Sequence, residues 1–202
     1  MTYTQAYSHI DDLLDKTGTA YFIEDEKKRF LDLAVLEYTS YMINKLESDA
    51  EAMEKISPLV VTSDALSQSA GTITISGGAV NDFYHLLRAY TATANYEVNI
   101  MSHNEYGSSK NDPFHKPDAS HPVGILRGGN LDIVGTTENI IVQYIKNPKL
   151  TTDNSFSASD ALGGYDINCH NEILNIAVRK MMLSVEDPRY QPQVNELSAD
   201  KR

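Results

Sequence analysis

The sequence predicts an α+β fold, in which a helical region (two N-terminal helices plus a C-terminal helix) carries an inserted antiparallel β lobe, either a sandwich or a barrel. Three observations lead to this prediction. Apolar residues recur at helical spacing early in the chain and again near its end. Between these parts, short alternating stretches are separated by glycine and asparagine turns. Strands grouped in this way, with helices outside them, are typical of a separate β layer.

Residues 1–57 are expected to form the N-terminal helices. The first covers residues 4–16 and stops at Thr17-Gly18. The second runs from Glu24 to about Lys55, because acidic residues in its first turn favour the helix dipole and a proline follows its end.

The second helix contains an unusually wide apolar collar, residues 30–36, in which six residues of seven are apolar. A one-sided surface helix needs only an apolar stripe. The collar is therefore expected to be buried on several sides, within one subunit or partly against another.

Residues 58–148 are expected to form the antiparallel β lobe. The alternating stretches predict strands at residues 59–62, 72–76, 89–94, 96–101, 123–127, 130–134 and 138–146. Asn81 is expected to cap a short helix over residues 82–88, and residues 102–121 are expected to form a loop. Gly128-Gly129 predicts a tight hairpin.

The C-terminal part is predicted as a loop at 149–168, a helix at 169–187 that packs on the N-terminal helices, and an extended tail at 188–202. Apolar residues of the helix face inward at helical spacing, while Arg179 and Lys180 are expected to face outward. The tail has two prolines and almost no apolar run, so it cannot pack a core of its own. We expect it to end exposed or on a partner.

Composition excludes several functional classes. The formal net charge is −11, so no basic stripe is present to neutralise the phosphates of a tightly bound nucleic acid. An acidic surface suits a conduit through which DNA passes without adhering to the wall, although an acidic composition also keeps a protein soluble.

No apolar run approaches the roughly 18 residues of a membrane span, and the first residues do not resemble a signal peptide. The single Cys169 leaves no disulfide within the chain.

No motif predicts catalysis or a bound cofactor. The six histidines lack metal-ligand spacing, and no phosphate-binding loop or nucleophile motif occurs. We therefore expect no enzymatic activity, no cofactor and no metal.

Two segments remain distinctive. Asn111–Asp118 has the sequence N-D-P-F-H-K-P-D, in which two prolines stiffen the backbone around Phe114. This aromatic side chain either docks into a neighbouring subunit or pins the loop to its own domain. The other segment, Val142–Lys149, is a strand that runs into a proline.

Together with other motifs, these segments resemble head-to-tail connector ring or adaptor proteins of tailed bacteriophages, especially of crAss-like podoviruses. The matching motifs follow in order at Asp82–Tyr84, Asp112–Pro117, Pro122-Val123, Tyr144–Pro148 and Glu186–Gln191. One departure is the stretch G-G-Y-D-I-N before the last helix, where such proteins often have a sequence like L-P-E.

The resemblance implies a structural virion protein of the neck or tail, assembled in the host cytoplasm. Its subunits would form a closed ring of about twelve copies. The implied partners are further copies of itself, the portal protein and other connector or tail ring proteins, with DNA passing unspecifically through the lumen. No membrane partner is expected.

The candidate contact residues follow from this hypothesis. Lateral subunit contacts are expected at Phe30, Leu33, Leu36, Tyr41, Phe114, Lys116 and Pro117. Contacts to the next ring are expected at Asp187, Arg189, Tyr190, Gln191, Val194 and Leu197.

Two alternatives stay open. One is a tail-tube, tail-completion or fibre-attachment protein of the same kind of virion. The other is a carbohydrate-binding or hydrolytic β domain, which the absence of Trp disfavours and the 12 Tyr residues leave possible.

Overall fold

The computed structural model describes residues 1–14, 22–75, 80–111, 114, 116–153 and 156–184. The chain divides into two compact units. The first unit combines Met1–Pro58 with Pro148–Arg202, and the second unit is Leu59–Asn147. The predicted α+β fold, a helical region plus a β lobe, is confirmed.

The first unit contains α1 (Tyr3–Leu13), α2 (Glu24–Lys45), α3 (Ala50–Ile56), a 3-10 turn at Leu162–Gly164 and α5 (Ile167–Ser184). Another 3-10 turn, Ser57–Leu59, crosses the boundary between the units.

The single helix expected from Glu24 to Lys55 is in fact two helices. The Asp49 side chain accepts a hydrogen bond from the Glu51 backbone N–H (2.9 Å) and so starts α3 as a new helix. The last helix also begins earlier than predicted, at Ile167.

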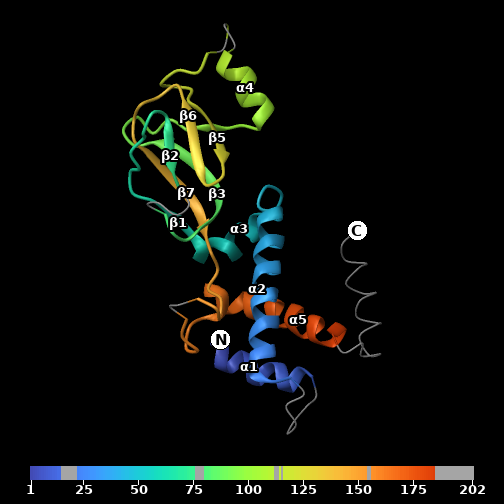
Figure 1. The fold of residues 1–202 in the computed structure, drawn as a ribbon. Helices are drawn as coiled ribbons and strands as arrows, with labels where there is room; N and C mark the ends of the chain where they lie inside the picture. The colour runs from blue at the N-terminus through green and yellow to red at the C-terminus, as the bar shows by residue number, and fades with distance from the viewer. Residues whose placement is uncertain (15–21, 76–79, 112–113, 115, 154–155, 185–202) are drawn as a thin grey trace. The chain divides into compact units, whose positions relative to one another are not determined.

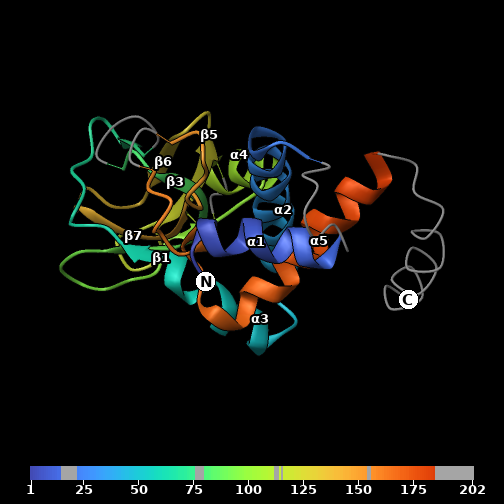
Figure 2. The ribbon, with the colours of Figure 1, turned by 90° about the horizontal axis from the view of Figure 1, so that it is seen from below.

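The helices of the first unit pack around α2. Both α1 and α5 contact α2, and α5 runs across it rather than along it (Figures 1 and 2). The buried apolar side chains of these three helices are Tyr3, Ala6, Ile10, Phe30, Leu31, Ala34, Val35, Tyr38, Met42, Cys169, Ile173, Leu174, Ala177, Val178 and Met181. A buried hydrogen bond of 2.7 Å joins the hydroxyls of Thr39 and Tyr165, so the polar groups of this core are partly paired as well.

The second unit contains two sheets. The first sheet has the order β1 (Val60–Thr62), β7 (Ile140–Lys146) and β3 (Phe83–Thr91), all antiparallel. The second has the order β2 (Thr72–Thr74), β6 (Asn130–Val134), β5 (Val123–Arg127) and β4 (Asn99–Ile100). Because β4 pairs with β5 in parallel, the lobe is not purely antiparallel as predicted.

The two sheets share one apolar core and do not close into a barrel. This core contains Leu66, Ile73, Ile75, Val80, Ala89, Val98, Leu131, Ile133, Ile140, Val142 and Tyr144. Of the two predicted forms of the lobe, the barrel is therefore wrong.

Two predictions inside this unit are wrong. The helix expected after Asn81 is the start of β3, which pairs with β7 along its whole length. The loop expected at 102–121 contains a helix, α4 (His103–Asn111). The Ser102 hydroxyl and backbone N–H both donate to the Glu105 carboxylate (2.7 and 3.1 Å), and this Ser-x-x-Glu pattern is a helix-start signal in the sequence.

Among the described residues, no helix is both long enough and apolar enough to cross a membrane.

Candidate functional site

Within the described part of the chain, no three His, Cys, Asp or Glu side chains gather where they could bind a metal ion. Asp118, Ser120 and His121 do lie together on an exposed turn. The Asp118 carboxylate accepts directly from the Ser120 hydroxyl (2.7 Å) and from two backbone N–H groups, which lowers its pKa to about 2. In a catalytic triad the histidine separates the carboxylate from the serine, so this turn is not one.

The outward face of α2 carries the clearest candidate contact residues. Leu33 is 46% exposed, Tyr41 is 38% exposed and Leu36 is half-buried. The Lys45 ammonium lies 4.6 Å from the centre of the Tyr41 ring. We call Leu33, Leu36 and Tyr41 the α2 surface.

The collar is thus divided between the core and the α2 surface. Leu31, Ala34 and Val35 face the core. Phe30 is also buried, and it packs edge-on against Phe22 with ring centres 5.9 Å apart. Its side chain is already used inside the first unit, so Phe30 is left out of the proposed lateral contacts.

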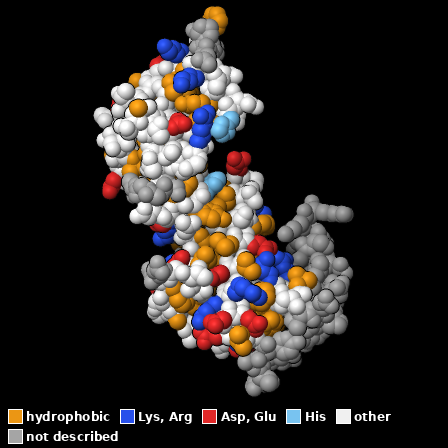
Figure 3. All heavy atoms as spheres, viewed as in Figure 1, with side chains coloured by type: hydrophobic (Ala, Val, Ile, Leu, Met, Phe, Trp, Pro, Cys, Tyr) orange, Lys and Arg blue, Asp and Glu red, His pale blue; other side chains and the backbone are white. Residues whose placement is uncertain are grey.

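Two grooves lie beside α2, both within the first unit. The groove between α2 and α5 has a volume of about 650 Å³ and is lined by Glu37, Tyr38, Ser40, Tyr41, Asn44, Lys45, Glu172, Asn175, Ile176 and Arg179. The other has a volume of about 550 Å³ and is lined by Asp25, Lys28, Arg29, Asp32, Leu33, Leu36 and residues 150–152. Figure 3 shows apolar, basic and acidic side chains next to one another over this unit. The α2 surface therefore borders both grooves.

Ion pairs fix α5 to α2 along the first of these grooves. The Glu37 carboxylate binds Arg179 at 2.9 Å and Lys180 at 2.5 Å. Both cations were predicted to face outward, and instead they are partly buried against α2. Lys55 of α3 binds Glu172 of α5 at 2.8 Å, and this pairing raises the pKa of Lys55.

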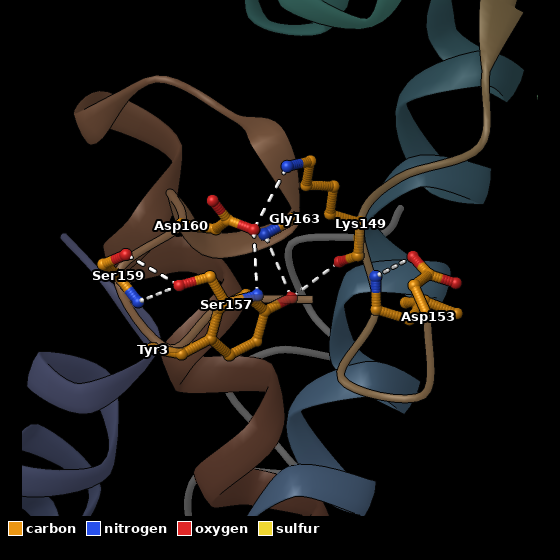
Figure 4. Close-up of polar contacts among 8 residues, drawn as sticks. Tyr3, Lys149, Asp153, Ser157, Ser159, Asp160 and Gly163 are labelled. Atoms are coloured by element: carbon orange, nitrogen blue, oxygen red, sulfur yellow. Dashed lines mark hydrogen bonds and ion pairs between the residues drawn. The ribbon is translucent and has the colours of Figure 1, made fainter. Parts of the chain in front are cut away.

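The segment before α5 is anchored on α1 and α2. The buried Tyr3 hydroxyl donates to the Lys149 carbonyl (2.6 Å) and accepts from the Gly163 backbone N–H (3.3 Å), as Figure 4 shows. The Asp32 carboxylate accepts from the backbone N–H and the hydroxyl of Thr151, at 2.9 and 2.6 Å, and burial raises the pKa of Asp32. These bonds hold one wall of the second groove in place.

Replacing Tyr3 by phenylalanine is expected to destabilise the first unit by about 1–3 kcal/mol, because the part-buried Lys149 carbonyl and the buried Gly163 N–H lose their partner. Urea unfolding of the purified chain measures this change. Tyr96→Phe is a matched control, since Tyr96 is exposed and its hydroxyl makes no hydrogen bond to any described residue. Equal free energies of unfolding for the two variants would contradict the anchoring role of Tyr3.

The remaining lateral candidates lie in the second unit. Phe114 is 89% exposed and Lys116 is exposed, whereas Pro117 is buried. The residue after Pro117 is Asp118, and it lies so close to Gly135 that a Cβ added to this glycine would come within 2.6 Å of the Asp118 carbonyl oxygen. Because Pro117 is buried, it is left out of the proposed lateral contacts.

The second unit also has a groove between β3 and the segment 97–100, which we call the β3–β4 groove. Its volume is about 440 Å³, and it is lined by Leu87, Arg88, Glu97, Val98, Asn99 and Ile100. Both β3 and β4 are edge strands of their sheets, so the groove lies along two sheet edges. A hydrogen bond from the Val98 N–H to the Ala89 carbonyl (2.8 Å) holds its floor together.

The predicted contacts to the next ring all lie outside the described residues. They are Asp187, Arg189, Tyr190, Gln191, Val194 and Leu197.

Sequence reasoning did not predict the grooves. Glu37 and Arg179 are 142 residues apart, and no local spacing relates them. The β3–β4 groove could have been found only by recognising residues 83–91 as one strand.

No protein-family model matches this sequence, and no curated protein matches it either. Function is therefore inferred from the surfaces described above and from the order of the sequence motifs.

Proposed function

We propose that this chain is a structural subunit of an oligomeric ring in the head-to-tail connector of a tailed bacteriophage, of the crAss-like podovirus kind. The observation that carries the proposal is the α2 surface, where Leu33 and Tyr41 are exposed and a groove lies on each side. Exposed apolar side chains next to grooves are typical of protein interaction sites. Two different grooves also suit head-to-tail contacts, in which one subunit presents different surfaces to its two neighbours.

The lateral contacts in this proposal come from both units. They are Leu33, Leu36 and Tyr41 on α2, with Phe114 and Lys116 in the second unit. Residues 187–197 are proposed to bind the portal protein or an adjacent ring, because their composition does not favour a core of their own. The net charge of −11 would keep passing DNA from adhering to the ring. The proposed place is the neck or tail of the virion, after assembly in the host cytoplasm.

Native mass spectrometry of the full chain, alone and with the portal protein, tests this proposal. We expect a closed ring of about 270 kDa, which is twelve times the chain mass of 22.5 kDa. A chain that ends at Asp187 is expected to form the same ring and to lose binding to the portal or adjacent ring.

Each part of the proposal can fail separately. A ring of six or three copies would favour a tail-tube or fibre-attachment protein. A chain that stays monomeric both alone and on the portal would overturn the ring itself. Intact portal binding by the shortened chain would remove the role of the tail.

A further inference from the structure

We propose that His170 is an acid-sensitive lock, which holds the N-terminal segment, Met1–Tyr3, at the start of α5 near neutral pH and releases it when the imidazole is protonated. The lock lies entirely within the first unit. It goes beyond the proposed function and does not rest on it, because it follows from the hydrogen bonds of one buried side chain.

The neutral His170 side chain makes two hydrogen bonds of opposite direction. His170 lies near the start of α5 and is only 2% exposed. Its Nε2 lies 2.9 Å from the Tyr165 carbonyl oxygen, and its Nδ1 lies 2.8 Å from the Met1 amino nitrogen. A carbonyl oxygen only accepts, so Nε2 carries a hydrogen and donates it. Nδ1 of the neutral imidazole then has the lone pair that accepts from Met1.

Protonation of His170 removes one of these two hydrogen bonds. A protonated imidazole donates at both nitrogens and has no acceptor. Its Nδ1–H would point at the Met1 nitrogen, which is itself a donor and carries a positive charge. The hydrogen bond to the Tyr165 carbonyl would remain. Protonation therefore breaks the contact to the N-terminal segment and leaves the contact within the chain next to α5.

The surroundings of His170 disfavour its protonated form overall. Burial lowers the pKa of His170, the hydrogen bond to the Tyr165 carbonyl partly raises it, and the Met1 ammonium lowers it further. The Asp166 carboxylate, which comes just before α5, raises it least. Among the described residues, no charged group of α1, α2 or α3 contributes to this shift. The net effect is a pKa of His170 below its ordinary value.

The lowered pKa determines the direction of the pH effect. In the unfolded chain, His170 is protonated around the ordinary histidine pKa of about 6.5. Below this pH the unfolded state binds more protons than the folded state, so the folded state loses stability as the pH falls. Burial raises the pKa of the Asp32 carboxyl in the same unit, and such a group stabilises the folded state as the pH falls. Asp32 therefore acts in the opposite direction to His170.

The N-terminal segment held by this lock is connected to the second groove of the first unit. The Met1 carbonyl accepts a hydrogen bond from the Leu162 N–H at 3.2 Å. In the same segment, the Tyr3 hydroxyl donates to the Lys149 carbonyl, next to residues 150–152 that line the second groove. Release of the lock is therefore expected to loosen α1 and this wall of the groove, while the second unit stays folded.

NMR spectroscopy of the imidazole nitrogens in the full, unmodified chain tests the lock directly. At pH 7.5 we expect His170 as the tautomer with hydrogen on Nε2, and on acidification we expect a protonation midpoint below about 6.5. The native amide signals of residues 3–13 should disappear together with the protonation of His170. A hydrogen on Nδ1 at pH 7.5, or native signals of residues 3–13 that persist after His170 is protonated, would overturn the proposal.

Hydrogen exchange of two variants provides an independent test. His170→Gln removes the titrating group, and His9→Gln is the matched control because His9 is exposed on α1 of the same unit. Exchange is measured at pH 7.5 and 5.5 and expressed as protection factors, which correct for the effect of pH on chemical exchange. In the unmodified chain and in His9→Gln, protection of residues 3–13 should fall several-fold and at most about tenfold at the lower pH. In His170→Gln it should be the same at both pH values, and residues 59–147 should keep their protection in all three chains.

The outcomes of these experiments separate the lock from other sources of acid sensitivity. An equal fall in the protection of residues 3–13 in all three chains would overturn the proposal, because a group other than His170 would then cause it. If His170→Gln did not fold, the NMR titration of the unmodified chain would give the answer alone. Neither measurement depends on ring formation, so failure of the lock and failure of the proposed function are distinguishable.

Discussion

Replacing Leu33 by aspartate is expected to abolish ring formation while the subunit remains folded. Leu33 is 46% exposed on α2 and contributes to the α2 surface, so its loss leaves no cavity in the core. A carboxylate that is buried in a subunit contact, away from water and without a partner, costs roughly 3 kcal/mol or more of binding free energy. This corresponds to at least about a 100-fold loss of affinity. Native mass spectrometry should show monomers at concentrations where the unmodified chain is expected to form rings.

Met53→Asp provides the matched control for this experiment. Met53 is an apolar residue on α3 with 41% exposure, and it belongs to the same unit but not to the α2 surface. This variant is expected to form rings normally. Circular dichroism should show the same helix content for both variants. If Leu33→Asp assembled as well as Met53→Asp, the α2 surface would not be a lateral contact.

The sequence predicts the class of fold and most element positions because local signals determine them. Acidic residues at Glu24–Glu26 and a proline after the last turn were sufficient to bound the helices before residue 58. The break at Asp49 was missed, although aspartate is a strong start signal for a new helix. The helix α4 was missed in the same way, since Ser102 and Glu105 form a recognisable pair.

The error at β3 has a different physical cause. The helix was expected because Asn81 can cap it, and the apolar residues Phe83, Leu86 and Leu87 also match helical spacing. In the structure the register of β3 against β7 shifts between Phe83 and His85 and again between Leu86 and Arg88. Each irregularity adds a residue to the strand, so the apolar period rises from two towards three. A bulged edge strand therefore imitates a helix in sequence.

The candidate contact residues show the limit of pattern reasoning. The collar contains enough apolar residues for two faces, and the sequence does not say which of them face the core. The packing of Phe22 on Phe30 and the burial of Pro117 depend on tertiary contacts, which the spacing of residues along the chain does not predict. Leu33, Leu36, Tyr41, Phe114 and Lys116 keep accessible surface and stay in the proposal.

The second unit has its own apolar core, and this leads to the other large expected effect. Leu131 of β6 is fully buried, and the core it joins consists of side chains from the second unit. Leu131→Ala is expected to destabilise this unit by about 2–5 kcal/mol, because the deletion leaves a cavity between the two sheets. Hydrogen exchange measured by mass spectrometry should increase in peptides of residues 59–147, with α2 and α5 retaining their protection.

Leu31→Ala is the matched variant in the first unit, since Leu31 of α2 is also fully buried. It should produce the reverse pattern, with faster exchange in α1, α2 and α5 and little change in the strands. Separate responses would mean that each unit folds on a core of its own, so that ring contacts in one unit could change without unfolding the other. Equal acceleration across the whole chain in both variants would show instead that the two units unfold together as one cooperative body.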